Sequence, residues 1–271
     1  MNTPPSNAPK SHGRKTIRPT LQPRELMTHA PDLARAWKAQ VITLLPNAFP
    51  GILGESLSGK ALKDGLWQLE TVDLRMFGEG KHRNVDDTPA GGGAGMVLRA
   101  DIMAAAIDHT RQRIPAKAPL IYLSPRGKPF TQQMAQDLAK GPGCSLICGR
   151  FEGLDQRVID HYEILEISLG DFVLTGGEIA AQALIDVTVR LLPGVLGNSE
   201  STEEESFSNG LLEHPQYTRP ADWRGLAIPD VLMSGHHGEI AKWRQAQSQA
   251  LTQVRRQDLW KAWIEGNSEK T

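Results

Sequence analysis

Two glycine-punctuated loops near the middle of the chain have the residue types and spacing of a small-molecule site. The first covers residues 149–153, and the second covers residues 169–178, which include Gly176 and Gly177. Each loop follows a short apolar run that predicts a buried strand. Glycine at the carboxyl end of a strand lets backbone amides and carbonyls approach a ligand closely. The two loops therefore predict a pocket built mainly from main chain.

A third loop is expected beside them. Residues 120–123 form another apolar run, and residues 124–127 then break it with serine, proline and glycine. Strands that alternate with helices at this spacing predict βαβ units, and hence an α/β fold with a parallel sheet. Ligands of such sheets bind beyond the carboxyl ends of the strands. We therefore expect the three loops to meet at one edge of the sheet.

The composition of these loops indicates what they could bind. Apolar Leu169, Val173 and Leu174 stand among glycines, and positive charges are few. Backbone hydrogen bonds and apolar walls suit an adenosine that carries a cationic sulfonium better than they suit a triphosphate. Three ordinary tight turns are the alternative that the spacing leaves open.

A fourth glycine motif, residues 54–61, matches a phosphate-binding P-loop incompletely. Ala61 stands where the motif needs a hydroxyl for Mg²⁺, and Pro46 and Pro50 interrupt the strand that should precede it. We expect no phosphate site there.

The remaining elements follow from periodicity and from helix-end signals. Residues 40–45 predict the first strand, residues 72–74 a weaker one, and residues 99–110 a helix. Pro129 is typical of a helix's first turn, and Gly141 of a helix end.

The helix after the second loop has the clearest local signature. Thr175 and Glu178 have the spacing of a capping box, and Pro193 is expected to stop the helix. Its predicted apolar stripe consists of Ala180, Leu184, Val187 and Leu191.

The composition is that of an ordinary globular protein. Of 271 residues, 39% are hydrophobic and 23% are charged, which is enough to bury a core. No apolar run approaches the ~20 residues that span a bilayer, and the first residues lack an apolar signal-peptide centre, so the cytoplasm is the expected compartment. Cys144 and Cys148 are too few for a disulfide framework or a four-ligand zinc site, and we expect both in the core.

Polar and basic segments flank the central region. Residues 1–20 carry four basic side chains, several prolines and no acid, which predicts a disordered basic tail. Residues 197–209 are rich in glutamate and serine and predict a mobile linker. After Leu211 a mainly helical region places Trp243 and Trp260 among basic residues. That mixture suits RNA, or equally a solvated helix whose tryptophans lie in the core.

Two charged residues near the linker have simple explanations from spacing alone. Arg190 follows Asp186 by four residues, which is the spacing of an intrahelical ion pair. Glu205 belongs to an acidic, solvated run.

Taken together, eight segments in one order resemble the bacterial tRNA (guanine-N1)-methyltransferases, which modify the guanine 3′ to the anticodon. The resemblance covers about residues 40–260 of the chain. The matching segments are residues 85–89, 91–96, 122–125, 149–153, 169–178, 193–197, 210–220 and 231–237.

This resemblance implies a SPOUT-class enzyme with a deep trefoil knot, acting as a homodimer whose active sites lie between subunits. Composition and resemblance together predict a division of the chain into four parts. These are a disordered basic extension (1–36), an S-adenosylmethionine-binding methyltransferase domain (37–196), a mobile linker (197–211) and a helical tRNA-binding domain (212–271).

The resemblance further implies the residues that bind each ligand. Those expected to bind S-adenosylmethionine are Tyr122, Leu123, Ser124, Pro125, Gly127, Gly149, Leu169, Gly170, Asp171, Phe172, Val173, Leu174, Gly176 and Gly177. Those expected to bind the tRNA anticodon stem-loop are Gly95, Arg190, His214, Tyr217 and Arg219.

Catalysis by this family requires a general base for the proton on guanine N1. The family uses a linker aspartate supported by an arginine, and here Glu205 occupies the aspartate position while Arg190 matches the arginine. Glu204 is a competing candidate for the base. Glu152 matches a further position important for activity, either through Mg²⁺ or as part of a structural ion pair.

Two other functions remain to be distinguished from this one. Because the base position has changed from aspartate to glutamate, the chain could be an RNA-binding protein of the same fold without catalysis. A P-loop nucleotidase is the more distant alternative, and ATP binding would be its signature.

Overall fold

The computed structural model describes residues 33–197 and 205–268. Its centre is a five-stranded sheet of order β2-β1-β6-β5-β7, in which every neighbouring pair is parallel. The strands are β1 (Trp37–Thr43), β2 (Trp67–Asp73), β5 (Leu120–Pro129), β6 (Gly143–Cys148) and β7 (Leu165–Ser168). The predicted α/β fold with a parallel sheet is therefore confirmed. The tail predicted over residues 1–20 lies outside the described residues.

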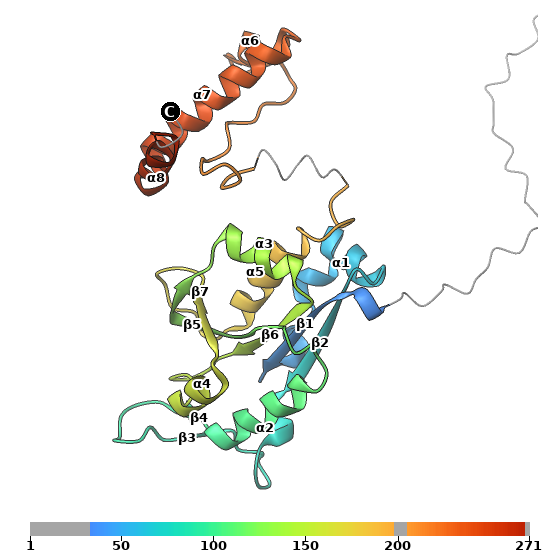
Figure 1. Ribbon diagram of the computed structural model, residues 1–271, viewed down its shortest axis with the longest axis vertical. Helices are drawn as coiled ribbons and strands as arrows, with labels where there is room; N and C mark the ends of the chain where they lie inside the picture. Colours follow the sequence, from blue (N-terminus) through green and yellow to red (C-terminus); the bar gives the residue numbers. More distant parts are fainter. Residues whose placement is uncertain (1–32, 198–204, 269–271) are drawn as a thin grey trace, which may run out of the picture. The chain divides into compact units, whose positions relative to one another are not determined.

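Helices cover both faces of this sheet (Figure 1). One face carries α1 (Ser56–Lys63), α3 (Gln132–Lys140) and α5 (Glu178–Val189), and the other carries α2 (Ala100–Arg111) and α4 (Gln156–Tyr162). The helix predicted over residues 99–110 is thus confirmed as α2. Short 3₁₀ helices connect some of the elements: η1 (Leu33–Arg35), η2 (Pro46–Ala48), η3 (Gly51–Gly54) and η4 (Leu74–Phe77).

Smaller elements complete the described chain. The strands β3 (Asp86–Asp87) and β4 (Val97–Leu98) form one antiparallel pair, and β8 (Asp222–Trp223) and β9 (Leu226–Ala227) form another. The last helices are α6 (Asp230–Met233), α7 (His237–Arg255) and α8 (Gln257–Ser268). None of the helices within the described ranges is long and apolar enough to cross a membrane.

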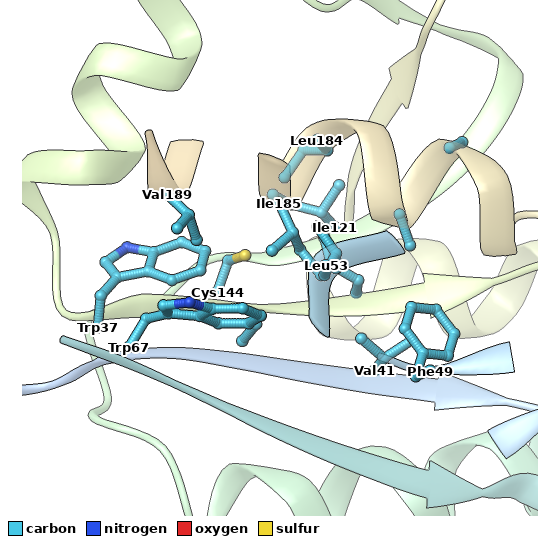
Figure 2. Close-up of a cluster of buried hydrophobic side chains, with 14 of the residues drawn as sticks. Trp37, Val41, Phe49, Leu53, Trp67, Ile121, Cys144, Leu184, Ile185 and Val189 are labelled. Carbon is cyan, nitrogen blue, oxygen red and sulfur yellow. The ribbon is translucent and has the colours of Figure 1, made fainter. Parts of the chain in front are cut away.

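Two tryptophans fix where β1 and β2 begin (Figure 2). Trp37 and Trp67 are register partners at the start of these strands, and both are buried. Their indole Nε1 atoms donate to the carbonyl oxygens of Leu138 and Ser58, each at 2.9 Å, so that burial leaves neither polar group unpaired. The predicted strand bounds, residues 40–45 and 72–74, were wrong because they followed aliphatic runs and missed these anchors.

The predicted start of the helix after β5 was also wrong. Pro129 is the last residue of β5, which continues beyond residues 124–127 through a register shift against β7. The helix α3 begins later, where the hydroxyl of Thr131 accepts a hydrogen bond from the Met134 amide at 3.3 Å. This side-chain cap explains the boundary. Gly141 is at the C-cap, as predicted.

The capping box predicted at residues 175–178 does not form. The N-cap of α5 is Gly177, with no side-chain cap, and the Glu178 carboxylate instead makes tertiary contacts. The helix ends at Val189 rather than at Pro193, and its buried face differs from the predicted stripe because Val187 and Leu191 are only half-buried. The buried residues of α5 are Glu178, Ala180, Ala181, Leu184, Ile185, Thr188 and Val189.

The glycines of the P-loop-like segment serve local packing. Residues 54–61 form the end of η3 and most of α1. A side chain at Gly59 would collide with the Gly54 carbonyl, so this glycine allows the 3₁₀ turn to pack on the helix start.

Both cysteines lie in the core as predicted. Cys144 and Cys148 are buried free thiols. Burial raises the pKa of the Cys144 thiol to about 12, because the charged thiolate would lose its hydration.

Candidate active site

The loops that follow β6 and β7, together with residues 122–126 inside β5, surround one cavity of about 290 Å³. These three strands are neighbours in the sheet and are parallel, so their carboxyl ends lie at the same edge. The three predicted segments therefore meet at one edge of the sheet as expected, but residues 124–127 were wrongly predicted as a loop, because they lie inside β5 where its register against β7 shifts. The cavity is lined by Tyr122, Leu123, Ser124, Pro125, Arg126, Gly149, Arg150, Phe151, Glu152, Gly153, Ile167, Ser168, Leu169, Gly170, Phe172, Val173, Leu174, Thr175, Gly176, Gly177 and Ala180.

Most of the residues predicted to bind the methyl donor line this cavity, and two do not. Gly127 packs against the backbone of Ile167, where β5 approaches β7 too closely for any side chain. Asp171 is exposed outside the lining. The cavity is also lined by residues that were not predicted, among them Arg126, Arg150 and Thr175, and their position within the predicted segments was the available signal.

Tyr122 explains the glycine at position 149. A Cβ atom at Gly149 would lie 2.8 Å from the Tyr122 hydroxyl oxygen, which is closer than real Cβ contacts. A glycine there lets the aromatic ring form part of the wall. Burial also raises the pKa of the Tyr122 hydroxyl, so the wall remains neutral near physiological pH.

Arg190 and Glu205 form a bidentate ion pair. Arg190 is the C-cap residue of α5, and its Nη1 donates to Glu205 Oε2 at 2.7 Å while its Nη2 donates to Oε1. The intrahelical pair with Asp186 that spacing suggested is not formed; among the contacts of the described residues, Asp186 meets Arg190 only through a backbone hydrogen bond. Glu204, the competing base candidate, lies outside the described residues.

The Arg190 guanidinium stabilises the charged form of the Glu205 carboxyl. Its hydrogen bonds hold the pKa of the Glu205 carboxyl below the usual range, and they raise the pKa of Arg190 in turn. Because the folded-state pKa of Glu205 is lowered, the pair stabilises the fold above the ordinary glutamate pKa, and that stabilisation is lost as the pH falls through the lowered value. Glu205 is therefore a carboxylate, able to accept a proton, at neutral pH.

Gly95 and Glu152 are brought together from separate segments. The Glu152 amide donates to the Met96 carbonyl at 2.9 Å, and the Glu152 side chain occupies the space that a Cβ atom at Gly95 would take. Within the described ranges, the Glu152 carboxylate makes no ion pair. Neither Arg190 nor Glu205 lines the cavity that Glu152 lines.

Two of the three residues predicted to contact tRNA after position 212, His214 and Tyr217, line a smaller cavity of about 210 Å³. Tyr217 meets Trp243 edge to face, with ring centroids 6.1 Å apart, and His214 is buried beside them. Arg219 is exposed and does not line this cavity.

The described residues contain no cluster of three or more histidine, cysteine, aspartate or glutamate side chains that could hold a metal ion. Glu152 is thus not part of a ready-made metal site in this part of the chain.

A parallel α/β sheet with a glycine-lined cavity beyond its strand ends is the arrangement of proteins that bind small organic ligands. Comparison with known families identifies which of them this chain resembles. The chain belongs to the tRNA (guanine-1)-methyltransferase family TrmD, whose family model matches residues 37–262. The resemblance found in the sequence is therefore confirmed.

Individual relatives match over nearly their whole length. The tRNA (guanine-N(1)-)-methyltransferase of Ruegeria sp. (strain TM1040) is 70% identical over 237 residues, covering 88% of this chain and 97% of that protein. The protein of the same name from Roseobacter denitrificans is 67% identical, with 85% of this chain and 96% of the relative covered. That from Nitrobacter winogradskyi is 60% identical, with 83% and 94% covered.

Proposed function

We propose that this protein transfers a methyl group from S-adenosylmethionine to N1 of guanine 37, the guanine 3′ to the tRNA anticodon. Family membership supports the reaction type. The observation that carries the mechanism is the bidentate pair of Arg190 and Glu205. The same chain has a glycine-lined cavity at the edge of its sheet. The reaction belongs in the cytoplasm, where tRNA is found.

The cavity fits the methyl donor by its chemistry. Its glycine-rich loops expose main-chain groups for the adenine and ribose, while Leu169, Val173 and Leu174 provide apolar walls. Its volume of about 290 Å³ is near the lower end for ligand pockets, roughly 300–1,000 Å³. When bound, S-adenosylmethionine supplies an electrophilic methyl group on a cationic sulfonium. Gly127 and Asp171 remain predicted contacts that the cavity does not include.

Glu205 is proposed as the general base. Guanine N1 carries a weakly acidic proton, which must leave as the methyl–nitrogen bond forms. The Glu205 carboxylate takes that proton, and the guanidinium of Arg190 stabilises the negative charge that develops toward guanine O6. S-adenosylhomocysteine leaves with the electron pair of the broken carbon–sulfur bond.

The Arg190–Glu205 pair predicts how the reaction depends on pH. We expect the acid limb of kcat/KM to lie below about pH 4.3, the ordinary pKa of glutamate, because Arg190 lowers the pKa of Glu205. Replacing Arg190 by methionine should raise that pKa and move the acid limb to higher pH. Normalised profiles of the two proteins, recorded where circular dichroism shows both folded, measure the shift. Superimposable profiles would contradict the role of Arg190.

A homodimer is proposed because one chain leaves its site incomplete. The cavity and the Arg190–Glu205 pair do not share lining residues. Large apolar side chains are exposed beside the cavity, namely Phe172 (55%), Val173 (83%) and Ile179 (63%). A second copy that covers these side chains would bring its own Glu205 to the neighbour's cavity.

The SPOUT-class trefoil knot is also part of the proposed function. The Gly177 amide donates to the Gly149 carbonyl, and this close approach of the two loops is compatible with a threaded backbone.

We propose that residues 212–271 form the tRNA-binding domain and that residues 197–211 link it to the methyltransferase domain (37–196). The Tyr217–Trp243 pair and basic residues of α7 supply the aromatic and positive groups that RNA recognition uses. Because basic side chains would contact the tRNA phosphates, we expect the affinity for tRNA to fall steeply as the salt concentration rises.

Tyr217 offers a direct test of this surface. The side chain is 47% exposed, so its ring is accessible to an unstacked base. Tyr217→Ala should weaken tRNA binding by about 1–3 kcal/mol, the usual contribution of base–aromatic stacking, with donor affinity unchanged. Filter binding measures the loss, and Tyr217→Phe, which keeps the ring, is the matched control. An alanine variant that binds tRNA like the parent protein would exclude this contact.

Methyl transfer is tested with a labelled donor and a tRNA transcript that carries guanines at positions 36 and 37. We expect the label to enter the transcript. A folded protein that binds the tRNA but transfers no label would favour the non-catalytic RNA-binding function.

A further inference from the structure

A buried carboxylate lies directly behind the wall of the cavity. Glu178, the first residue of α5, is 5% exposed and does not line the cavity itself. The Thr43 hydroxyl, at the carboxyl end of β1, donates to Glu178 Oε1 at 2.7 Å. Thr43 is held in turn, because its hydroxyl accepts a hydrogen bond from the Leu45 amide at 2.9 Å. One oxygen of Glu178 is therefore fixed to the sheet.

The other oxygen of Glu178 reaches a residue that does line the cavity. Arg150 Nη2 lies 3.2 Å from Glu178 Oε2, and Arg150 Nη1 donates to the Thr175 carbonyl at 3.3 Å. Arg150 belongs to the loop after β6, and Thr175 to the loop after β7. The ion pair thus joins both cavity loops to α5 and to β1.

The backbone is shaped around this ion pair. A Cβ atom at Gly176 would lie 2.5 Å from Arg150 Nε, and a Cβ atom at Gly177 would lie 2.7 Å from the Cα atom of Cys148. The Gly177 amide donates to the Gly149 carbonyl at 3.0 Å. The two glycines therefore leave the room that the guanidinium of Arg150 and the end of β6 occupy.

The guanidinium depends on Glu178 for its orientation. Arg150 Nε is buried and has no hydrogen-bond partner in the described part of the chain. A buried donor without a partner is unfavourable, so the contacts of Nη1 and Nη2 must hold the side chain in place. Without the Glu178 carboxylate, the carbonyl of Thr175 would be the one remaining partner of the Arg150 guanidinium among the residues that the structure describes.

We propose that Glu178 is a positioning residue for the methyl donor, which acts through Arg150 to hold the loops 149–153 and 169–177 in their binding geometry. This inference rests on the proposed function, because it takes the cavity as the donor site. Positions behind a binding wall matter in this way because a displacement of ~1 Å can cost on the order of 10²-fold in activity.

The test is a double-mutant cycle measured by calorimetric titration with S-adenosylmethionine. Glu178→Gln keeps the shape of the side chain and removes its charge, and we expect donor affinity to fall by roughly ten- to a hundredfold. In an Arg150→Gln background the same substitution should have little further effect, since residues that act as one unit are not additive. Affinity for tRNA should stay unchanged. If Glu178 had only a structural role, Glu178→Gln would lower the Tm, but its effect on donor affinity would not depend on whether Arg150 is present.

A matched control keeps the outcomes distinct. Asp160→Asn also removes one carboxylate, from the exposed surface of α4, where it accepts a hydrogen bond from Gln156 at 2.9 Å; it should bind the donor like the parent protein. Parent-like donor affinity in Glu178→Gln, or additive effects of the two substitutions, would overturn the inference. If the parent protein itself does not bind S-adenosylmethionine, it is the proposed function that fails.

Discussion

Glu205→Gln should lower kcat for methyl transfer by about 10²–10⁴-fold, the usual contribution of a general base. Glutamine is similar in size but cannot accept the N1 proton, and it can still accept a hydrogen bond from Arg190. Affinity for S-adenosylmethionine should remain near that of the parent protein, because Glu205 does not line the cavity. Single-turnover kinetics with saturating donor and tRNA measure the chemical step directly.

Glu204→Gln is the control for this prediction, since Glu204 is the neighbouring carboxylate. We expect it to retain most of the activity, because the structure places Glu205 on Arg190. A large loss in Glu204→Gln together with near-normal turnover in Glu205→Gln would transfer the role of base to Glu204.

Gly177→Ala should nearly abolish donor binding and destabilise the fold. The added Cβ atom would lie 2.7 Å from the Cα atom of Cys148 and 3.0 Å from the amide nitrogen of Gly149. Both are backbone atoms at the end of a central strand, so neither can move aside without displacing the cavity loops. Overpacking of this kind costs about 1–3 kcal/mol. Thermal unfolding and calorimetric titration with the donor measure the two effects.

Gly266→Ala is the matched control, because nothing lies within 4 Å of a Cβ atom added at this exposed position of α8. There the same substitution should be neutral or stabilising by up to about 1 kcal/mol, since alanine favours helices over glycine. A Gly177→Ala protein with the stability and donor affinity of the parent would contradict the prediction, because it would show that the cavity loops can shift to make room for a Cβ atom.

Much of the cavity region could be predicted from the sequence, because its signals are local. Glycines directly after apolar runs marked the ends of β6 and β7. The general rule for parallel sheets then placed the loops together. The limits of β1 and β2 were harder to predict because they depend on the pairing of Trp37 with Trp67 and on the hydrogen bond from Trp37 to Leu138, which lies far away in the sequence.

The contacts of side chains whose partners lie far along the chain could not be predicted from local sequence patterns. Glu178 has the spacing of a capping residue, yet the Thr43 hydroxyl and the Arg150 guanidinium hold it in a tertiary network. Likewise, Arg190 pairs with Glu205 across the linker instead of with Asp186 in its own helix. Family resemblance, rather than periodicity, is what predicts a function for that second pair.

The measurement that tests the central proposal most directly is the position of the transferred methyl group. Purified protein, labelled S-adenosylmethionine and a transcript with guanine at position 37 are compared with the same transcript carrying adenine there. We predict label only in the guanine transcript, together with a reverse-transcription stop beside position 37, because a methyl group on N1 blocks base pairing. Label at another base, or no label from a folded protein that binds both ligands, would contradict the proposal.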